Sequence, residues 1–426
     1  MRKQDSGGFW RLTFRDPEFR VILIIATSIW ILTSILKFPF IVPSIYSDVG
    51  WLWIRDVYLG HHNLQIPYLQ YQLEYPQVIG LVIYLGQAIS TYFPFVIDSY
   101  NTFVVAESIL QFPFMIGTLY NLYMLCGWLK LSRFRLYLYI LSTLTFVIYG
   151  FYNWDFIVAY FVSLSIWFYL DHRFDASAIT LTAAVLTKFI PGLMLPAMLS
   201  GLPNNKARWR FTLIAASLWS AVNAPFAILN FGTWIQLFVG YSGPNHQLQN
   251  TWISWVIMAA GLGDVVSGAR AGQILSFSII TFLILRAIVS KKTPLEKILL
   301  SWYAWYGAIY LFDPQMFVQL LPIVILTPNF NFLLYRVADA LNSFIILFYF
   351  IGGSHPQLPS YLTDQLTPFG LINMCAALRQ LIFLGAYFVS FSPKLQKRVK
   401  EIGGTLISPL SGGQARSPTG RSRSRP

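Results

Sequence analysis

The chain has 426 residues, of which 56% are hydrophobic and 11% are charged, whereas about a quarter of the residues in a soluble globular protein are charged. This composition excludes an ordinary soluble fold, and the 35 Phe, 24 Tyr and 14 Trp fit a polytopic membrane protein. The net charge is +13, and eight of the 30 basic residues lie from Lys394 onward, where they suit an anionic membrane face. Since no aromatic or glycine module accompanies the RSRS stretch of this tail, we expect no nucleic-acid partner.

Apolar runs long enough for membrane-spanning helices recur along the chain. They occupy residues 21–42, 101–127, 136–150, 155–170, 211–229, 271–289, 332–351 and 371–391. The first run follows a basic, cytoplasmic N-terminus at residues 1–20 and has no small-residue cleavage site, so it is expected to be an uncleaved span. We therefore predict an all-α fold, a polytopic transmembrane bundle of about 11–13 helices. One domain covers residues 21–391, and a basic, disordered cytoplasmic tail covers residues 392–426.

Two further apolar segments are interrupted by polar residues and proline. Lys188 and Pro191 interrupt residues 176–200, and Asp313 and Pro314 interrupt residues 295–327. Each segment is predicted to form two helices that meet at a polar break, because proline disfavours the helical conformation in the residue before it. The two breaks are expected to face the same side of the membrane.

The basic loops indicate the topology, because short loops rich in Lys and Arg stay in the cytoplasm. All of them can be cytoplasmic only if residues 77–97 do not cross the membrane. Gly80, Gly86 and Pro94 favour a broken, re-entrant helix there, which gives about twelve crossings. The alternative is a real crossing with one basic loop on the wrong side.

This topology places many polar residues on the external face, and ionisable groups at membrane depth are functional candidates. These residues are Asp48, Arg55, Asp56, His61, His62, Glu74, Asn153, Asp155, Lys188, Asp313 and Gln315, together with Asn245, His246 and Gln247 in an external loop at residues 231–250. Such convergence from distant loops indicates one external site.

The first external loop, residues 46–76, is the most informative stretch. Ser47 can cap an amphipathic helix at the membrane interface. Asp48 and Arg55 are seven residues apart, so on a helix they share a face and could address one ligand that carries a hydroxyl and a phosphate. The alternative is that Asp48 is a second capping residue and Arg55 an interfacial cation.

Several motifs resemble a known family. The loop reads YSDVGWLWIRDVYLGHHNLQIPYLQYQLEYPQ over residues 46–77, and NWD, TKFIPGLMLP and FDPQMFVQLLP follow at residues 153–155, 187–196 and 312–322. In this order and spacing they resemble the C superfamily of membrane glycosyltransferases (GT-C), most closely glycosyltransferase family 87 and its polyprenol-phosphate-mannose-type relatives. The family commonly shows a second proline and SPQ where this chain has EYPQ and DPQ, which leaves the sugar open.

The resemblance implies a mannosyltransferase, or another hexosyltransferase, of the bacterial cell envelope and plasma membrane. Its donor would be a polyprenyl-phosphate sugar and its acceptor a lipid or glycan, with membrane lipids around it. The catalytic acid of the family corresponds to Asp48, expected to act as general base. The remaining candidates for substrate binding are Arg55, Asp56, Glu74, Tyr75, Asn153, Asp155, Lys188, His246, Asp313 and Gln315.

Some of these assignments have structural alternatives. Lys188 and Arg55 are candidates to stabilise the leaving phosphate, but Lys188 could also be a snorkelling cation at a helix end, and Asp155 a helix cap. The histidines lack a second His at ligand spacing, so no metal ligand is assigned and the need for a divalent cation stays open.

Two other classes of protein share parts of this pattern. A secondary transporter or lipid-linked sugar flippase also buries charges and breaks helices, but its site commonly lies at the midplane between repeated halves, and the halves of this chain do not match. In a structural membrane subunit the external polar cluster would be incidental. The density of tyrosine and acidic residues in the first loop favours the transferase.

Overall fold

The computed structural model describes residues 15–42, 45–55, 64–242, 248, 251–264, 266–327, 332–354, 357–364, 367, 369–392 and 394–395. Within these ranges the regular secondary structure is entirely helical, and an isolated β-bridge joins Pro67 and Tyr71. The all-α prediction is confirmed for this part of the chain. The predicted tail from residue 396 onward lies outside the described residues.

Six helices are long and apolar enough to cross a membrane, as expected for a multi-pass membrane protein. They are α2 (Pro17–Ile35), α6 (Ser99–Trp128), α12 (Asn205–Leu229), α15 (Ala269–Val289), α18 (Phe332–Ser354) and α20 (Leu371–Val389). The total of about twelve crossings stays a prediction, because the other apolar helices are shorter.

Shorter helices fill the spaces between these spans. They are α3 (Asp48–Arg55), α5 (Gln77–Tyr92), α7 (Phe134–Leu136), α8 (Leu144–Tyr149), α9 (Asp155–Leu170), α10 (Phe174–Val185), α11 (Met194–Gly201), α13 (Phe231–Ser242), α14 (Ile253–Ala259), α16 (Pro294–Ala308), α17 (Phe317–Leu326) and α19 (Ser360–Thr363). Short 3₁₀ turns, η2 (Ile190–Leu193) and η3 (Pro314–Met316), precede α11 and α17. Helix α3 is the helix predicted in the first loop, and α13 begins the segment predicted as a loop at residues 231–250.

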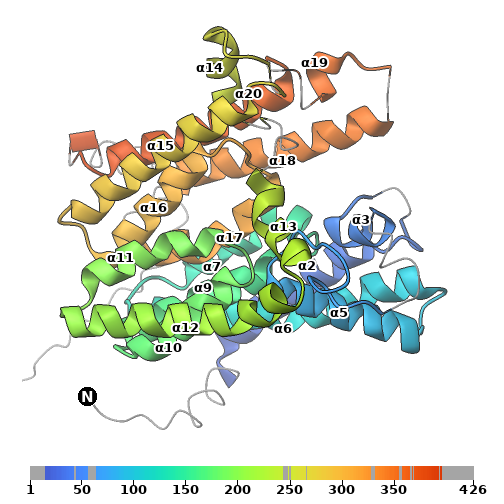
Figure 1. The fold of residues 1–426 in the computed structure, drawn as a ribbon, viewed down its shortest axis with the longest axis horizontal. Helices are drawn as coiled ribbons and strands as arrows, with labels where there is room; N and C mark the ends of the chain where they lie inside the picture. Colours follow the sequence, from blue (N-terminus) through green and yellow to red (C-terminus); the bar gives the residue numbers. More distant parts are fainter. Residues whose placement is uncertain are drawn as a thin grey trace, which may run out of the picture.

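Helix α17 is the centre of the bundle. Every residue from Phe317 to Leu326 is buried, and the helix packs against α6, α9 and α16. Helices α15, α16, α18 and α20 lie together on one side of it, and α6, α9, α10 and α12 lie on the other (Figure 1). Helix α13 crosses between these two groups (Figure 1).

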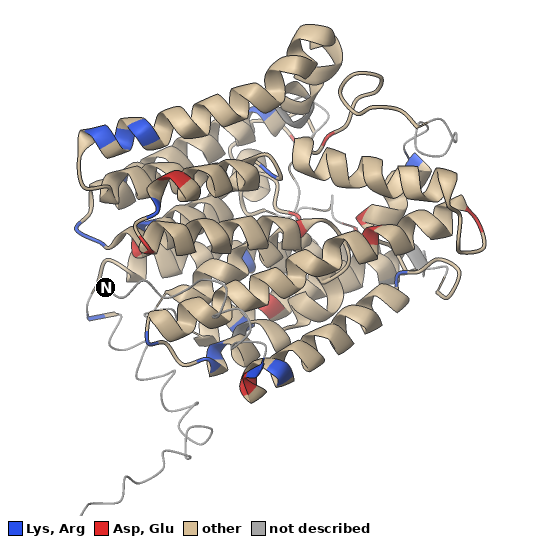
Figure 2. Ribbon diagram, turned by 90° about the horizontal axis from the view of Figure 1, so that it is seen from below, with Lys and Arg blue, Asp and Glu red and all other residues tan. Residues whose placement is uncertain are grey.

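The basic ends of several helices meet at one end of the bundle. Their contacts are Arg133 to Asp16 at 3.4 Å, Arg210 to Asp175 at 2.5 Å and Lys297 to Ser200 at 3.2 Å. These contacts join the segment after α6 to the start of α2, α12 to α10, and α16 to the end of α11. Figure 2 draws many of the Lys and Arg residues at the left-hand ends of the helices. That these loops face the cytoplasm remains a prediction.

The two breaks predicted at Lys188 and Asp313 are confirmed. Helix α10 ends at Val185 and the next turn starts at Ile190, while α16 ends at Ala308 and the next turn starts at Pro314. In both segments a proline occupies the first or second position of the new turn, where its missing N–H costs nothing.

Residues 136–150 do not form the one continuous helix that was expected, because the chain breaks at Ser142–Thr143; whether the segment crosses the membrane stays a prediction. A π-helical turn, η1 (Tyr137–Leu141), ends there and α8 begins. The break is stabilised by Asp339 of α18, whose carboxylate accepts the backbone N–H groups of Leu144 and Thr145 at 3.1 and 2.9 Å. A side chain distant in sequence thus caps the new helix.

The prediction of a broken helix at residues 77–97 is also wrong. Helix α5 is continuous over its 16 residues, with Gly80 and Gly86 inside it. A Cβ atom at Gly80 would lie 2.2 Å from the Tyr68 hydroxyl oxygen, and one at Gly86 would lie 2.4 Å from Glu107 Oε1. The glycines therefore allow close packing rather than a break. Because Gly86 faces Phe103 and Glu107, α5 lies along the N-terminal part of α6; whether it crosses the membrane stays a prediction.

We expect Gly80→Ala to lower the stability of the protein, by about 1–3 kcal/mol, because its methyl group would collide with the buried ring of Tyr68. Gly385→Ala in α20 is the control, since nothing lies within 4 Å of its Cβ position and alanine favours a helix. Thermal unfolding in detergent measures both variants. Equal stability of the two variants would contradict the packing role of Gly80.

Candidate functional site

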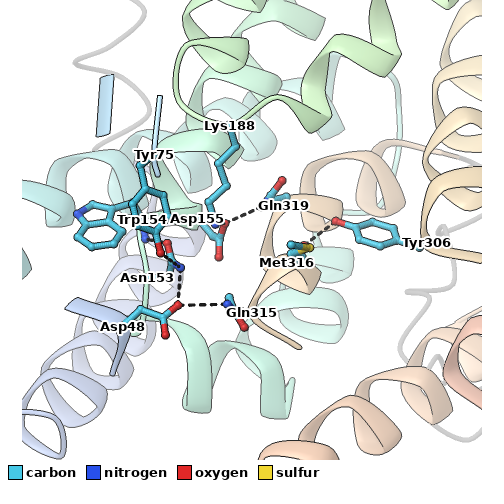
Figure 3. Close-up of polar contacts among 10 residues, drawn as sticks. All are labelled: Asp48, Tyr75, Asn153, Trp154, Asp155, Lys188, Tyr306, Gln315, Met316 and Gln319. Carbon is cyan, nitrogen blue, oxygen red and sulfur yellow. Dashed lines mark hydrogen bonds and ion pairs between the residues drawn. The ribbon is translucent and has the colours of Figure 1, made fainter. Parts of the chain in front are cut away.

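The candidate site is assembled from four positions at which the chain starts or interrupts a helix. Asp48 begins α3, Asn153 and Asp155 flank the start of α9, Lys188 lies in the break after α10, and Gln315 lies in the break before α17. Figure 3 shows these side chains pointing toward one another, from segments up to 267 residues apart in sequence. The convergence predicted from the sequence is therefore present for these residues.

Asp48 is held by two side-chain amides. Asn153 Nδ2 donates to Asp48 Oδ2 at 2.6 Å, and Gln315 Nε2 donates to the same oxygen at 3.1 Å (Figure 3). The Asp48 backbone N–H donates to the carbonyl of Tyr152 at 3.0 Å, which fixes the start of α3 beside Asn153. The cap of the first turn is Ser47, whose hydroxyl oxygen accepts from Gly50 N at 3.1 Å. The Asp48 carboxylate itself thus engages distant residues rather than its own helix.

The surroundings of Asp48 shift its ionisation toward neutral pH. Desolvation by burial raises its pKa to about 7; the hydrogen bond from Asn153 opposes this shift, and the negative charge of Asp313 adds to it. The positive charge of Lys188 acts in the opposite direction. A carboxyl group that changes charge near pH 7 is suited to proton transfer.

Lys188 and Asp155 form a buried ion pair. The Lys188 ammonium lies 2.7 Å from Asp155 Oδ1, and the two side chains are 12% and 2% exposed. Gln319 Nε2 donates to the same carboxylate oxygen at 2.6 Å (Figure 3). Lys188 is therefore directed into the protein instead of snorkelling, and Asp155 binds side chains from two other segments.

The turn that carries Asn153 and Asp155 is fixed by the tryptophan between them. Trp154 is fully buried, and its indole N–H donates to Glu107 Oε2 of α6 at 2.8 Å. Its ring packs against Tyr75, with centroids 4.9 Å apart. This packing directs the side chains on either side of Trp154 toward Asp48 and Lys188.

A cavity of about 370 Å³ adjoins these residues. The side chains of Tyr75, Asn153, Lys188, Asp313 and Gln315 line its polar part. The larger part of the lining is apolar and comes from both sides of the bundle: Phe189, Ile190, Phe238, Phe277, Trp305, Ile309, Leu311 and Met316. Asp48 lies directly behind this lining, in contact with Asn153 and Gln315. The cavity can therefore hold a ligand with one polar end and one apolar end.

The remaining predicted site residues lie elsewhere or outside the described residues. Arg55 pairs with Glu74 at 3.0 Å, with about 40% of each side chain exposed (42% and 39%). A ligand shared by Asp48 and Arg55 therefore stays a prediction. Asp56 and His246 lie outside the described residues.

Gln319 is a site residue that was not predicted from the sequence. It follows Gln315 by four residues, so the start of α17 presents both amides on one side. That spacing in FDPQMFVQLLP was the available signal. In the part of the chain that the structure describes, no group of three His, Cys, Asp or Glu side chains is placed to hold a metal ion.

No protein-family model matches the chain, and no curated protein matches it. The chemistry of the site must therefore be argued from its own residues.

Lys188→Met should destabilise the protein by about 3–5 kcal/mol, because it leaves the Asp155 carboxylate buried without its counter-ion. The double variant Lys188→Met/Asp155→Asn should recover most of this loss, since both charges are gone and Gln319 can still donate to the new amide. Thermal unfolding measures the effect.

Lys292→Met is the control for this prediction. Lys292 pairs with Glu296 at 3.3 Å on one helix end, where both side chains are more exposed, and its loss should cost about 1 kcal/mol or less. A Lys188→Met variant as stable as Lys292→Met would argue against a buried ion pair.

Proposed function

We propose that the protein is a membrane glycosyltransferase. It transfers a hexosyl residue, mannosyl in the enzymes that the sequence resembles, from a polyprenyl-phosphate donor to a lipid or glycan acceptor. The observation that carries this proposal is the Asp48 carboxylate held by Asn153 and Gln315, both of which line a mostly apolar cavity that also contains Lys188.

The proposed reaction is a single displacement. Asp48 accepts the proton of the acceptor hydroxyl, and the hydroxyl oxygen forms a bond to the anomeric carbon of the sugar. The bond between that carbon and the phosphate oxygen breaks, and its electron pair leaves with the polyprenyl phosphate. A carboxyl with a pKa near 7 is suited to the first step, because enough of it is ionised at neutral pH.

Lys188 supports the choice of a phosphate leaving group. Lys188 lines the cavity, and its ammonium pairs with the Asp155 carboxylate. A phosphate that arrives near Lys188 would gain a cation at the point where negative charge develops, which lowers the barrier. The Asp155 and Gln319 contacts keep that cation in place.

The apolar lining supports a lipid-linked donor. Aromatic side chains from α13, α15 and α16, namely Phe238, Phe277 and Trp305, line the cavity. A water-soluble nucleotide sugar would leave these surfaces unused, whereas isoprene units bury them. We infer that the reaction takes place on the external face, because the positive-inside rule assigns the basic loops to the cytoplasm. A bacterial plasma membrane is inferred from the sequence resemblance.

Asp48→Asn should lower the transfer rate by about 10²- to 10⁴-fold, because it removes the base and keeps the shape. Folding should survive, since the asparagine oxygen can still accept from Asn153 and Gln315. The assay is transfer of labelled sugar from polyprenyl-phosphate donors by purified protein in nanodiscs, with thermal stability measured alongside.

Ser47→Ala is the matched control for Asp48→Asn. It removes the cap of the same helix and should cost about 1 kcal/mol of stability with little change in rate. Wild-type transfer by Asp48→Asn would refute the assignment of the base.

The pH dependence of transfer gives a separate prediction. Since the base must be ionised and its pKa is raised to about 7, kcat/KM should fall about tenfold per pH unit below that value and level off above it. The measurement is kcat/KM between about pH 5 and 9, with folding checked at each pH. A profile that stays flat through pH 7 would contradict the role of Asp48.

A further inference from the structure

Arg379 lies in the interior of the bundle, in contact with the segment that leads into Asp313 and Gln315. It belongs to α20 and has no exposed surface. Its Nη2 donates to the carbonyl of Phe312 at 2.8 Å, and its Nη1 donates to Asn342 Oδ1 of α18. The guanidinium carbon also lies 3.5 Å from the centroid of the Phe312 ring. Burial of a guanidinium is costly, so these contacts must outweigh a large desolvation penalty.

The contacts of Arg379 belong to a set that fixes alternate carbonyls of one break. Arg379 donates to the Phe312 carbonyl, Asn342 Nδ2 donates to that of Pro314 at 2.9 Å, and the Tyr306 hydroxyl donates to that of Met316 at 2.6 Å. The three donors come from α20, α18 and α16 respectively. The segment has only the short 3₁₀ turn η3 of its own, and side chains from three other helices hold its carbonyls at every second residue.

The two residues between these carbonyls line the cavity, as do the neighbouring Leu311 and Met316. Asp313 and Gln315 alternate with Phe312, Pro314 and Met316, and Gln315 reaches Asp48 at 3.1 Å. Displacement of the held carbonyls would therefore move Gln315 away from Asp48. A shift of about 1 Å near a reacting group can lower a rate by about 10²-fold.

We propose that Arg379 is a positioning residue: through Phe312 and Asn342 it holds residues 312–316 so that Gln315 meets Asp48 and Asp313 faces the cavity. Its effect on transfer rests on the proposed function, whereas its effect on the backbone of this break does not. The two effects are therefore measured separately.

Arg135 of α7 offers a matched control, because it donates to carbonyls at the other end of α17. Its guanidinium donates to the carbonyls of Val324, Ile325 and Thr327 at 3.0, 2.7 and 2.9 Å, which lie at the end of α17 away from the site. Arg379 and Arg135 thus hold opposite ends of one buried helix and its flanking turns, and the carbonyl that Arg379 holds directly precedes Asp313, which lines the cavity.

The first experiment is hydrogen–deuterium exchange of the full chain in nanodiscs. Arg379→Met should speed exchange of the backbone amides in residues 311–316 and leave residues 324–327 unchanged, and Arg135→Met should do the opposite. Asn342→Ala, which removes the side-chain donor to the Pro314 carbonyl and one acceptor of Arg379, is the second variant in case Arg379→Met does not fold. If neither Arg379→Met nor Asn342→Ala speeds exchange at 311–316, the positioning role is refuted, whatever the protein transfers.

The second experiment is a double-mutant cycle in the transfer assay. Arg379→Met and Gln315→Ala should each lower kcat more than they raise KM, and the double variant should be no slower than the slower single variant, because both act on one contact. In the same cycle with Arg135→Met in place of Arg379→Met, the rate losses of the two single variants should multiply in the double variant. Arg379→Lys, which keeps a donor and the charge, should restore part of the rate.

The outcomes separate the two proposals. A multiplicative Arg379–Gln315 cycle would overturn the positioning role even if transfer is observed. Faster exchange at 311–316 with no transfer by the wild type would refute the proposed function and leave the positioning role intact.

Discussion

The structure depends on satisfying polar groups wherever a helix is interrupted inside an apolar bundle. In such surroundings an unpaired backbone group or charge costs several kcal/mol, so each interruption needs a partner from elsewhere. Asp339 caps the break at residue 143, Asp155 pairs with Lys188 in the break after α10, and Arg379 with Asn342 holds the break at Asp313. The fold of this chain is therefore defined by its broken helices as much as by its spans.

The same requirement creates the candidate site. When hydrogen bonds from other helices hold the backbone of these breaks, the remaining side chains of the segments can face a common cavity. Asn153, Lys188 and Gln315 do so. Asp48 joins them from α3 through hydrogen bonds to two of these residues. The Lys188 cation and the amides of Asn153 and Gln315 are thus held in place by the fold itself. Such preorganised charges and dipoles make the largest electrostatic contribution to lowering a reaction barrier.

The sequence predicted the features that depend on local composition. The apolar runs, the Lys188–Pro191 interruption and the Asp313–Pro314 interruption are visible in the chain itself, and the structure has them. The errors arose where a distant side chain decides the outcome. Gly80 and Gly86 suggested a break because Tyr68 and Glu107, which pack against them, could not be placed from the sequence. The break at residue 143 depends on Asp339, which lies 194 residues after the Thr145 N–H that it accepts, and the amides on Asp48 come from 105 and 267 residues away.

The central claim is that this cavity breaks the bond between a sugar and a lipid phosphate. The most direct test is to follow that bond with purified protein in sealed proteoliposomes, supplied with a labelled polyprenyl-phosphate hexose and a pool of lipid and glycan acceptors. The account predicts that free polyprenyl phosphate is released and that its amount matches the sugar transferred to an acceptor. Movement of the intact lipid-linked sugar across the bilayer, with no release of polyprenyl phosphate, would contradict it and identify a transporter instead.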